Sequence, residues 1–302
     1  MKILLFGKNG QVGWELQRSL CVLGEMLAVD LDSKLPEGGG DFTKPDELVA
    51  LIHRFQPDVI VNAAAYTAVD KAESEPELAH LINAEAPGRI ALAAEEQKAL
   101  LIHYSTDYVF DGSGDCPWQE NSTTGPLNVY GITKLEGERQ IQNNCSRYFI
   151  FRTSWVYAAR GANFARTMLR QANEKKQLTV IDDQFGAPTG ADLIADITAH
   201  SINKLCSRRH DPNELYGTYH LVAHGETNWH QYARFVIATA LKIKPGLSLK
   251  VEEISPVPTS AFPTPAHRPK NSRLDTARLR EAFALVLPDW QVGVERMLRE
   301  IL

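Results

Sequence analysis

The chain has little cysteine and none of the spacings that bind structural metal. Its four cysteines, Cys21, Cys116, Cys145 and Cys206, are scattered, with no Cys-x-x-Cys pair and no cluster of histidines. Structural zinc sites need such clusters, so we do not expect one. Scattered cysteines also suit a reducing compartment better than a disulfide framework, and we therefore expect a cytoplasmic protein.

Long apolar runs and basic runs are absent too. No apolar stretch approaches the roughly 18 residues of a membrane span, and an apolar run begins at Ile3, which leaves no room for a signal peptide before it. There is no run of lysine and arginine, and the net charge of the 302 residues is −5. These features argue against membrane and nucleic-acid partners. The 44% hydrophobic content is enough for one large or two modest domains.

What the chain does have is an alternation of strand and helix patterns in its first half. Short apolar runs typical of buried parallel strands are followed by apolar residues at helical spacing. We expect strands at 3–6, 26–30, 57–62, 99–104 and 148–153, and helices at 12–20, 45–55, 76–97 and 127–143. This order predicts an α/β fold, a doubly wound parallel sheet of the Rossmann type.

The second half is less regular. We expect helices at 163–173, 192–205 and 229–241, strands at 178–181 and 215–222, and a proline-rich ordered loop or linker at 255–273. These patterns predict a dinucleotide-binding domain over 1–155, to which some later segments return. A smaller, mainly substrate-binding domain then covers 156–302, with the cleft between the two.

A glycine turn follows the first expected strand. Gly7, Gly10 and Gly13 lie at a spacing of three, between the apolar run and the first helical pattern. Glycines in a strand–turn–helix context let backbone amides approach a pyrophosphate, and the helix N-terminus adds free N–H donors. The second strand ends at Asp30, about twenty residues further on, where an acid can bind the ribose hydroxyls of NAD. Lys8 and Lys34 could instead favour NADPH, and Asp30 could simply cap a helix or turn.

The pair Tyr130 and Lys134 is the strongest catalytic signal. A spacing of four on a helix places both side chains on one face. A phenol with its ordinary pKa of about 10 is a poor acid near neutral pH. A neighbouring ammonium would lower that pKa, so we expect Lys134 to tune Tyr130 for proton exchange with a carbonyl oxygen. Thr106, just after a strand, could donate a second hydrogen bond to the same oxygen.

Several stretches together resemble the extended short-chain dehydrogenase/reductases. They are the turn 7–13, Asn62-Ala-Ala-Ala65, His103-Tyr-Ser-Thr-Asp-Tyr-Val-Phe-Asp-Gly112, Tyr130-x-x-x-Lys134, Asp183-Gln-Phe-Gly-Ala-Pro-Thr189 and Arg268-Pro-Lys-Asn-Ser272. The likeness covers nearly the whole chain and is greatest to members that reduce the 4-keto group of a dTDP-linked deoxysugar with NADPH or NADH. It implies a role in nucleotide-sugar synthesis for surface polysaccharides such as lipopolysaccharide, and a homodimer.

The resemblance also implies roles for individual residues. Those expected to contact the dinucleotide are Gly10, Gln11, Val12, Asp30, Asp41, Phe42, Ala65, Tyr66, Thr67 and Tyr104, besides Gly7, Gly13, Tyr130 and Lys134. Thr106, Asp107, Tyr130 and Trp155 would contact the substrate. Arg268 is a candidate clamp for the diphosphate, because guanidinium matches phosphate geometry. Trp155 could equally be a core tryptophan, and Arg268 a surface arginine.

Other functions remain open at this point. Related dehydratases resemble Thr-Asp-Glu where this chain has Thr106-Asp107-Tyr108, so an elimination reaction is not expected. An epimerase would use the same Tyr–Lys pair and retain its cofactor. A non-catalytic relative, similar to the regulatory subunit of methionine adenosyltransferase, would bind a dinucleotide without turnover. The resemblance further implies a magnesium ion near Glu15 and Asp192, the latter being Asp where Glu is more usual; both could also be solvated surface acids.

Overall fold

The centre of the molecule is a six-stranded parallel sheet. The computed structural model describes residues 1–33, 39–207 and 212–302, and Lys34 lies outside these ranges. The strands follow the order β10-β5-β4-β3-β1-β2, and every neighbouring pair is parallel. Their bounds are β1 (Lys2–Phe6), β2 (Glu25–Val29), β3 (Val59–Asn62), β4 (Leu100–Thr106), β5 (Tyr148–Thr153) and β10 (Gly217–His220). The predicted doubly wound α/β fold is confirmed.

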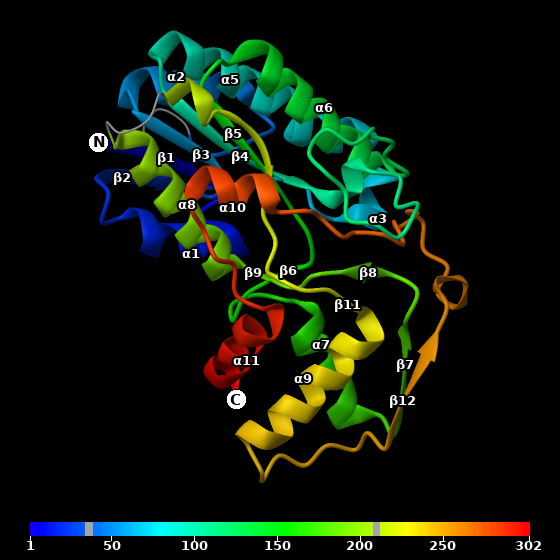
Figure 1. Ribbon diagram of the computed structural model, residues 1–302. Helices are drawn as coiled ribbons and strands as arrows, with labels where there is room; N and C mark the ends of the chain where they lie inside the picture. The colour runs from blue at the N-terminus through cyan, green and yellow to red at the C-terminus, as the bar shows by residue number, and fades with distance from the viewer. Residues whose placement is uncertain (34–38, 208–211) are drawn as a thin grey trace.

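Helices cover both faces of this sheet (Figure 1). On one face lie α1 (Gln11–Leu20), α8 (Ala191–Cys206) and α10 (Ala277–Phe283), and on the other lie α2 (Pro45–Phe55), α5 (Ala86–Gln97) and α6 (Val129–Asn144). In β1, Ile3 and Leu5 pack into the first layer, whereas Leu4 and Phe6 pack into the second. A strand buried on both sides needs apolar residues at every position, which explains the unbroken run in the sequence.

The expected helix 76–97 is continuous but changes its winding. It consists of α4 (Pro76–His80), a π-helical turn η1 (Leu81–Glu85) and α5. Pro87 has no N–H to donate, and the wider turn comes directly before it. The π turn also carries Asn83, whose side chain bonds the backbone of Tyr66 and the hydroxyl of Thr133 on α6.

The second half builds the lower lobe in Figure 1. Its helices are α7 (Phe164–Glu174), α9 (Trp229–Ile243) and α11 (Trp290–Ile301), which share a core around Tyr232, Trp290 and Met297. A two-stranded sheet joins β7 (Gln177–Ile181) to β12 (Glu253–Val257). The expectation of a loop or linker from residue 255 was therefore wrong for its first residues. Pro256 is tolerated in β12 because both strands of a two-stranded sheet are edges.

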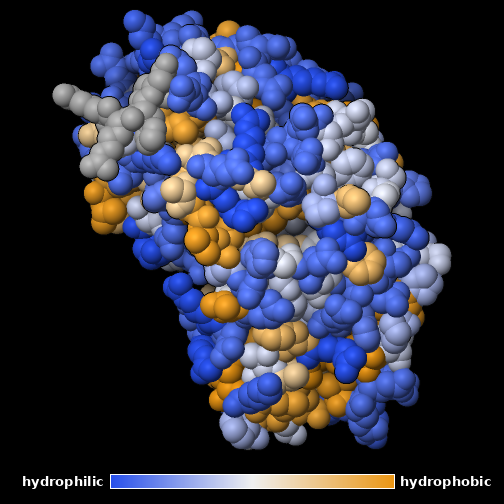
Figure 2. Space-filling model, viewed as in Figure 1, coloured by the Kyte–Doolittle hydropathy of each residue, from blue (hydrophilic) through white to orange (hydrophobic). Residues whose placement is uncertain are grey.

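Later segments return to the upper lobe. β10 joins the sheet beside β5, and α8 packs on α1. Short strands connect the lobes: β6 (Val156–Tyr157) pairs with β9 (Thr189–Gly190), and β8 (Phe185–Gly186) with β11 (Thr227–Asn228). Figure 2 shows a largely hydrophilic face, with its broadest apolar area at the foot of the lower lobe. Across the described ranges, no helix combines the length and the apolar character that crossing a bilayer requires.

Candidate active site

A cavity of about 570 Å³ opens at the carboxyl ends of the parallel strands. The chain runs from β1 to β2 on one side and then crosses to β3 on the other, so strand order reverses at β1. Ligands of open α/β sheets bind at such a switch point. The residues lining the cavity come from the ends of β1, β2, β3, β4 and β5, from α6 and from the start of α9.

The glycine turn forms the floor of the cavity beside β1 and β3. Gly7 has a φ of 81°, and a Cβ there would lie 2.6 Å from the backbone nitrogen of Ala64. A Cβ on Gly13 would lie 1.9 Å from the Gly7 carbonyl oxygen. Both positions therefore require glycine. The first turn of α1 starts at Gly10 without a side-chain cap, which leaves its N–H groups for an anion.

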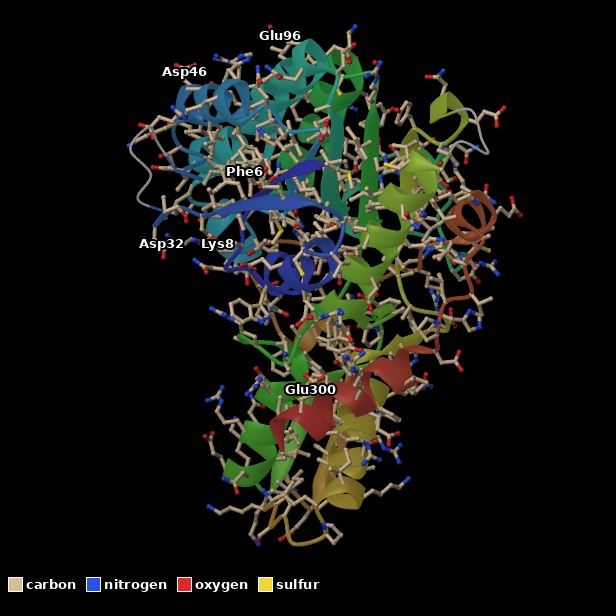
Figure 3. The ribbon with its side chains drawn as sticks, turned by 90° about the vertical axis from the view of Figure 1, so that its left-hand side faces the viewer. Phe6, Lys8, Asp32, Asp46, Glu96 and Glu300 are labelled. Carbon is tan, nitrogen blue, oxygen red and sulfur yellow. The ribbon has the colours of Figure 1, made fainter. Side chains whose placement is uncertain are left out.

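Asp30 lines the same cavity at the end of β2. Its Oδ2 accepts from the backbone N–H of Asn9 at 2.8 Å, and its Oδ1 accepts from Leu31 at 2.8 Å. The carboxylate thus ties the glycine turn to the second strand, in the place where a ribose would lie. Figure 3 labels Lys8 and Asp32 at the same edge of the upper lobe. Side chains that could favour NADH, the acids Asp30 and Asp32, therefore lie at the same edge as Lys8, which could favour NADPH.

Tyr130, Thr106 and Asp107 converge on the opposite wall. Asn128 caps α6 by accepting from the Gly131 N–H at 2.8 Å, which orients the helix turn carrying Tyr130. The Thr106 hydroxyl donates to Asp107 Oδ1 at 3.0 Å and lies within hydrogen-bonding reach of the Tyr130 phenol. Burial raises the pKa of Asp107 to about 6, although hydrogen bonds from Ser272 and Thr106 oppose this.

Lys134 follows Tyr130 by one turn of α6 and lines the same cavity, but it does not tune Tyr130 as predicted. Its Nζ donates to the Tyr104 carbonyl oxygen at 2.6 Å and lies 3.1 Å from His103 Nε2. Burial lowers the pKa of Lys134 to about 8. The pKa of Tyr130 is raised to about 12, chiefly by burial. The expected lowering of this pKa is therefore wrong, because burial dominates and the Lys134 amine bonds Tyr104 and contacts His103 instead.

Unsatisfied oxygens in the cavity wall fit a polar ligand. Within the described part of the chain, five buried side-chain oxygens of lining residues have no hydrogen-bond partner: Gln11 Oε1, Ser105 Oγ, Asp107 Oδ2, Thr153 Oγ1 and Ser154 Oγ. A buried, unpaired polar atom costs about 1–3 kcal/mol, so native proteins rarely leave several together. The wall is thus complementary to a ligand rich in hydroxyl and amide groups, such as a dinucleotide with a sugar.

Trp155 and Trp229 form the wall on the side of the lower lobe. Trp155 follows β5 with a φ of 48°, a strained conformation that recurs at ligand sites. Trp229 also lines the cavity, but sequence reasoning missed it. The only local signal was its place at the start of an expected helix, after Asn228, whose side chain caps α9. Nothing in the sequence relates position 229 to position 155.

The structure brings most of the expected residues to this cavity. Those lining it are Gly7, Gly10, Gln11, Val12, Asp30, Ala65, Thr67, Tyr104, Thr106, Asp107, Tyr130, Lys134 and Trp155. Gly13 lies directly behind the turn. Tyr104 presents its backbone, because its hydroxyl bonds Thr198 in the core at 2.8 Å.

Besides Gly13, four residues expected to bind cofactor or substrate lie outside the lining. Asp41 accepts from the N–H and the hydroxyl of Thr43, and Phe42 packs edge-on against Phe6. The Tyr66 hydroxyl donates to Glu75 at 2.6 Å. Arg268 Nη2 donates to Asp70 Oδ2 at 2.7 Å. Their roles in ligand binding stay predictions.

Glu15 and Asp192 meet at a second cavity of about 270 Å³, which also includes Glu300 on α11 (Figure 3). Each carboxylate is paired with an arginine: Arg18 lies 3.4 Å from Glu15, and Arg296 lies 3.3 Å from Asp192. In the described ranges, no three His, Cys, Asp or Glu side chains gather closely enough to hold a metal ion. The arrangement does not fit a bound magnesium ion, and we derive no step through one.

Fold and site together define a dinucleotide-dependent oxidoreductase of the extended short-chain dehydrogenase/reductase type. The RmlD substrate binding domain family matches residues 1–302, and the chain belongs to that family. A protein from Salmonella typhimurium named dTDP-4-dehydrorhamnose reductase is 57% identical over 301 residues, covering 100% of this chain and 98% of its own.

Solved structures agree with this assignment. The dTDP-4-dehydrorhamnose reductase from Clostridium acetobutylicum superposes with a TM-score of 0.87 at 32% identity, covering 99% of this chain and 98% of its own. The one from Bacillus anthracis, in complex with NADP, has a TM-score of 0.85 at 34% identity and covers 99% of both chains.

Proposed function

We propose that this protein reduces the 4-keto group of dTDP-4-dehydro-L-rhamnose to give dTDP-L-rhamnose, with NADPH or NADH as reductant. One observation carries the proposal. Thr106, Tyr130 and Lys134 line one cavity with the glycine turn, in a chain that is similar over its full length to enzymes of this name. A binding protein without turnover has no need of that catalytic set.

Different parts of the cavity wall would bind the cofactor and the sugar nucleotide. The bound nicotinamide would supply the hydride. The turn at Gly7–Gly13 would hold the pyrophosphate through backbone N–H groups, and Asp30 would hold the adenosine ribose. Trp155 and Trp229 would offer flat apolar surfaces to the sugar nucleotide.

Proton delivery falls to Tyr130. As the carbonyl carbon accepts the hydride, its oxygen becomes an alkoxide, and the phenol gives that oxygen a proton. The Thr106 hydroxyl donates a second hydrogen bond to the same oxygen once it turns from Asp107. Lys134, one helical turn further along α6, would reach the nicotinamide ribose.

The contacts of Arg268 support its expected role in binding the substrate diphosphate. Its Nε is buried and has no partner in the described part of the chain, and its Nη2 is bound by Asp70, next to the cavity-lining Val69. A diphosphate could take over this guanidinium from Asp70. The homodimer and cytoplasmic location expected from the sequence remain predictions.

The test is direct. The purified protein is mixed with NADPH or NADH and a dTDP-linked 4-keto deoxysugar, and loss of reduced-cofactor absorbance is followed. We expect stoichiometric oxidation that depends on the sugar, with a UDP-linked 4-keto sugar as the matched control. No net oxidation with a change of sugar configuration would support an epimerase. No change in either would support a binding role.

A further inference from the structure

Tyr108 lines the active-site cavity, and the reaction described above gives it no role. It lies on the 3₁₀ turn η2 (Asp107–Val109), which directly follows β4. From Leu100 to Phe110 every other residue is buried, and Tyr108 alone is partly exposed. A tyrosine suits such a place, because its ring can pack against the protein while its hydroxyl faces a ligand.

Three contacts hold Tyr108 in a fixed position relative to the proton donor. Its backbone N–H donates to Thr106 Oγ1 at 3.1 Å. Its carbonyl oxygen lies so close to α6 that a Cβ on Gly131 would be 2.2 Å away. Its ring meets the ring of Tyr130 edge-on, with the centroids 5.7 Å apart and the planes at 79°. Tyr108 therefore cannot shift in the cavity without disturbing Tyr130.

The hydroxyl of Tyr108 is a donor without an acceptor. Among the residues that the structure describes, it has no hydrogen-bond partner. Burial raises the pKa of this phenol and the nearby Asp107 raises it further, so the hydroxyl keeps its proton at neutral pH. The Arg268 guanidinium opposes this rise, which places that charge within electrostatic reach of the phenol. A protonated phenol can donate to an oxygen and does not repel an anion.

The backbone around Arg268 is attached to the same part of the wall. The carbonyl oxygen of His267 accepts from Asn128 Nδ2, the N-cap residue of α6, at 2.7 Å. Pro269 lies against Gly112, which follows η2, and a Cβ on that glycine would be 2.4 Å from the proline Cβ. Arg268 is thus held beside both η2 and the start of α6.

We propose that Tyr108 is a substrate-binding residue: its hydroxyl donates a hydrogen bond to an oxygen at the glycosyl end of the sugar nucleotide, on the sugar or on the phosphate that bears it. The inference rests on the proposed function and adds a residue to its site. Tyr130 reacts with the sugar and Arg268 is the expected partner of the diphosphate. Tyr108 lies against the first and within electrostatic reach of the second, so its hydroxyl sets the distance between the anchored end of the substrate and the proton donor.

Binding measurements test this assignment. Tyr108→Phe removes only the hydroxyl and keeps the ring that packs against Tyr130. The full-length protein, saturated with NADP⁺, is titrated by calorimetry with dTDP-L-rhamnose and with dTDP, which lacks the sugar. We expect dTDP-L-rhamnose to bind about threefold or more weaker to Tyr108→Phe than to wild type, as the loss of one hydrogen bond predicts.

The two ligands locate the acceptor. Weaker binding of both supports the proposal and assigns the acceptor to the phosphate, and the loss should then reach about tenfold or more because that oxygen is charged. Weaker binding of dTDP-L-rhamnose alone supports the proposal and assigns the acceptor to the sugar. Unchanged binding of both would overturn the proposal and leave Tyr108 with a packing role only.

Tyr148→Phe is the matched control. Tyr148 begins β5, at the end of the strand opposite the cavity, and its side chain is also partly exposed. This variant should bind both ligands as wild type does; a loss equal to that of Tyr108→Phe would overturn the proposal. If the wild-type protein bound neither ligand, the proposed function would fail together with this inference. If it bound both and Tyr108→Phe bound them equally well, this inference alone would fail.

Discussion

The indole rings of Trp155 and Trp229 stack with their centroids 3.6 Å apart and their planes 16° from parallel. Trp229 is anchored by its Nε1, which donates to Gln184 Oε1 at 3.1 Å. The pair joins β5 of the upper lobe to α9 of the lower lobe at the cavity wall. An aromatic surface assembled from two lobes suits a substrate that spans them.

Removing the supporting ring should weaken substrate binding. Aromatic pairs contribute about 0.5–1.5 kcal/mol beyond buried area, so Trp229→Ala should raise KM for the sugar nucleotide about two- to tenfold. The KM for the cofactor should change less, because the glycine turn lies elsewhere. Steady-state kinetics measures both, with Trp14→Ala, an exposed indole outside this cavity, as the control. The same change in both variants would refute the role of Trp229.

Gly7 should tolerate no side chain. Gly7→Ala combines a positive φ with a Cβ 2.6 Å from the backbone of Ala64, so the turn must shift. We expect a stability loss of more than about 1 kcal/mol and much weaker NADPH binding. Gly114→Ala is the matched control, because its φ is 69° but a Cβ there meets nothing within 4 Å. Denaturant unfolding and cofactor titration should separate the two variants; equal losses would mean that the close approach is unimportant.

Asp107 should make stability fall with rising pH. Its pKa is raised to about 6 in the fold from an unfolded value near 3.8. The folded state therefore binds the proton more tightly, and stability is lost as pH rises through this window. By that shift, ionisation costs on the order of 2–3 kcal/mol. The stability of Asp107→Asn, measured relative to wild type, should therefore be higher at pH 8 than at pH 4.

The exposed Asp111 should affect the pH dependence of stability in the opposite direction. Hydrogen bonds from Ser113 lower its pKa, so Asp111→Asn should lose stability at neutral pH and lose less in acid. Thermal unfolding of both variants across this pH range measures the contrast. A pH-independent difference between Asp107→Asn and wild type would contradict the burial argument.

Much of the upper lobe could be predicted because its signals are local. A buried parallel strand needs apolar residues throughout, and an amphipathic helix repeats them at helical spacing; α2 has the bounds Pro45–Phe55 that the sequence predicted. The carboxyl ends of parallel strands meet at one edge, so Gly7, Asp30 and Thr106 could be assigned to one site from their places in the sequence.

The rest depends on contacts between distant residues. Trp229 reaches the cavity only because α9 packs against Trp155, and β12 forms only where β7 offers a partner. The ionisation of Lys134 could not be predicted from Tyr130 alone. The pKa of Lys134 is lowered by burial, which exists only once α6 has packed against β4.

The central claim is that the phenol of Tyr130 protonates the substrate oxygen. Tyr130→Phe removes only that hydroxyl. The measurement is single-turnover oxidation of bound NADPH by the dTDP-linked 4-keto sugar, with NADPH affinity determined on the same protein. We predict a rate loss of about 10²- to 10⁴-fold with cofactor affinity retained. A wild-type rate in Tyr130→Phe would contradict the account.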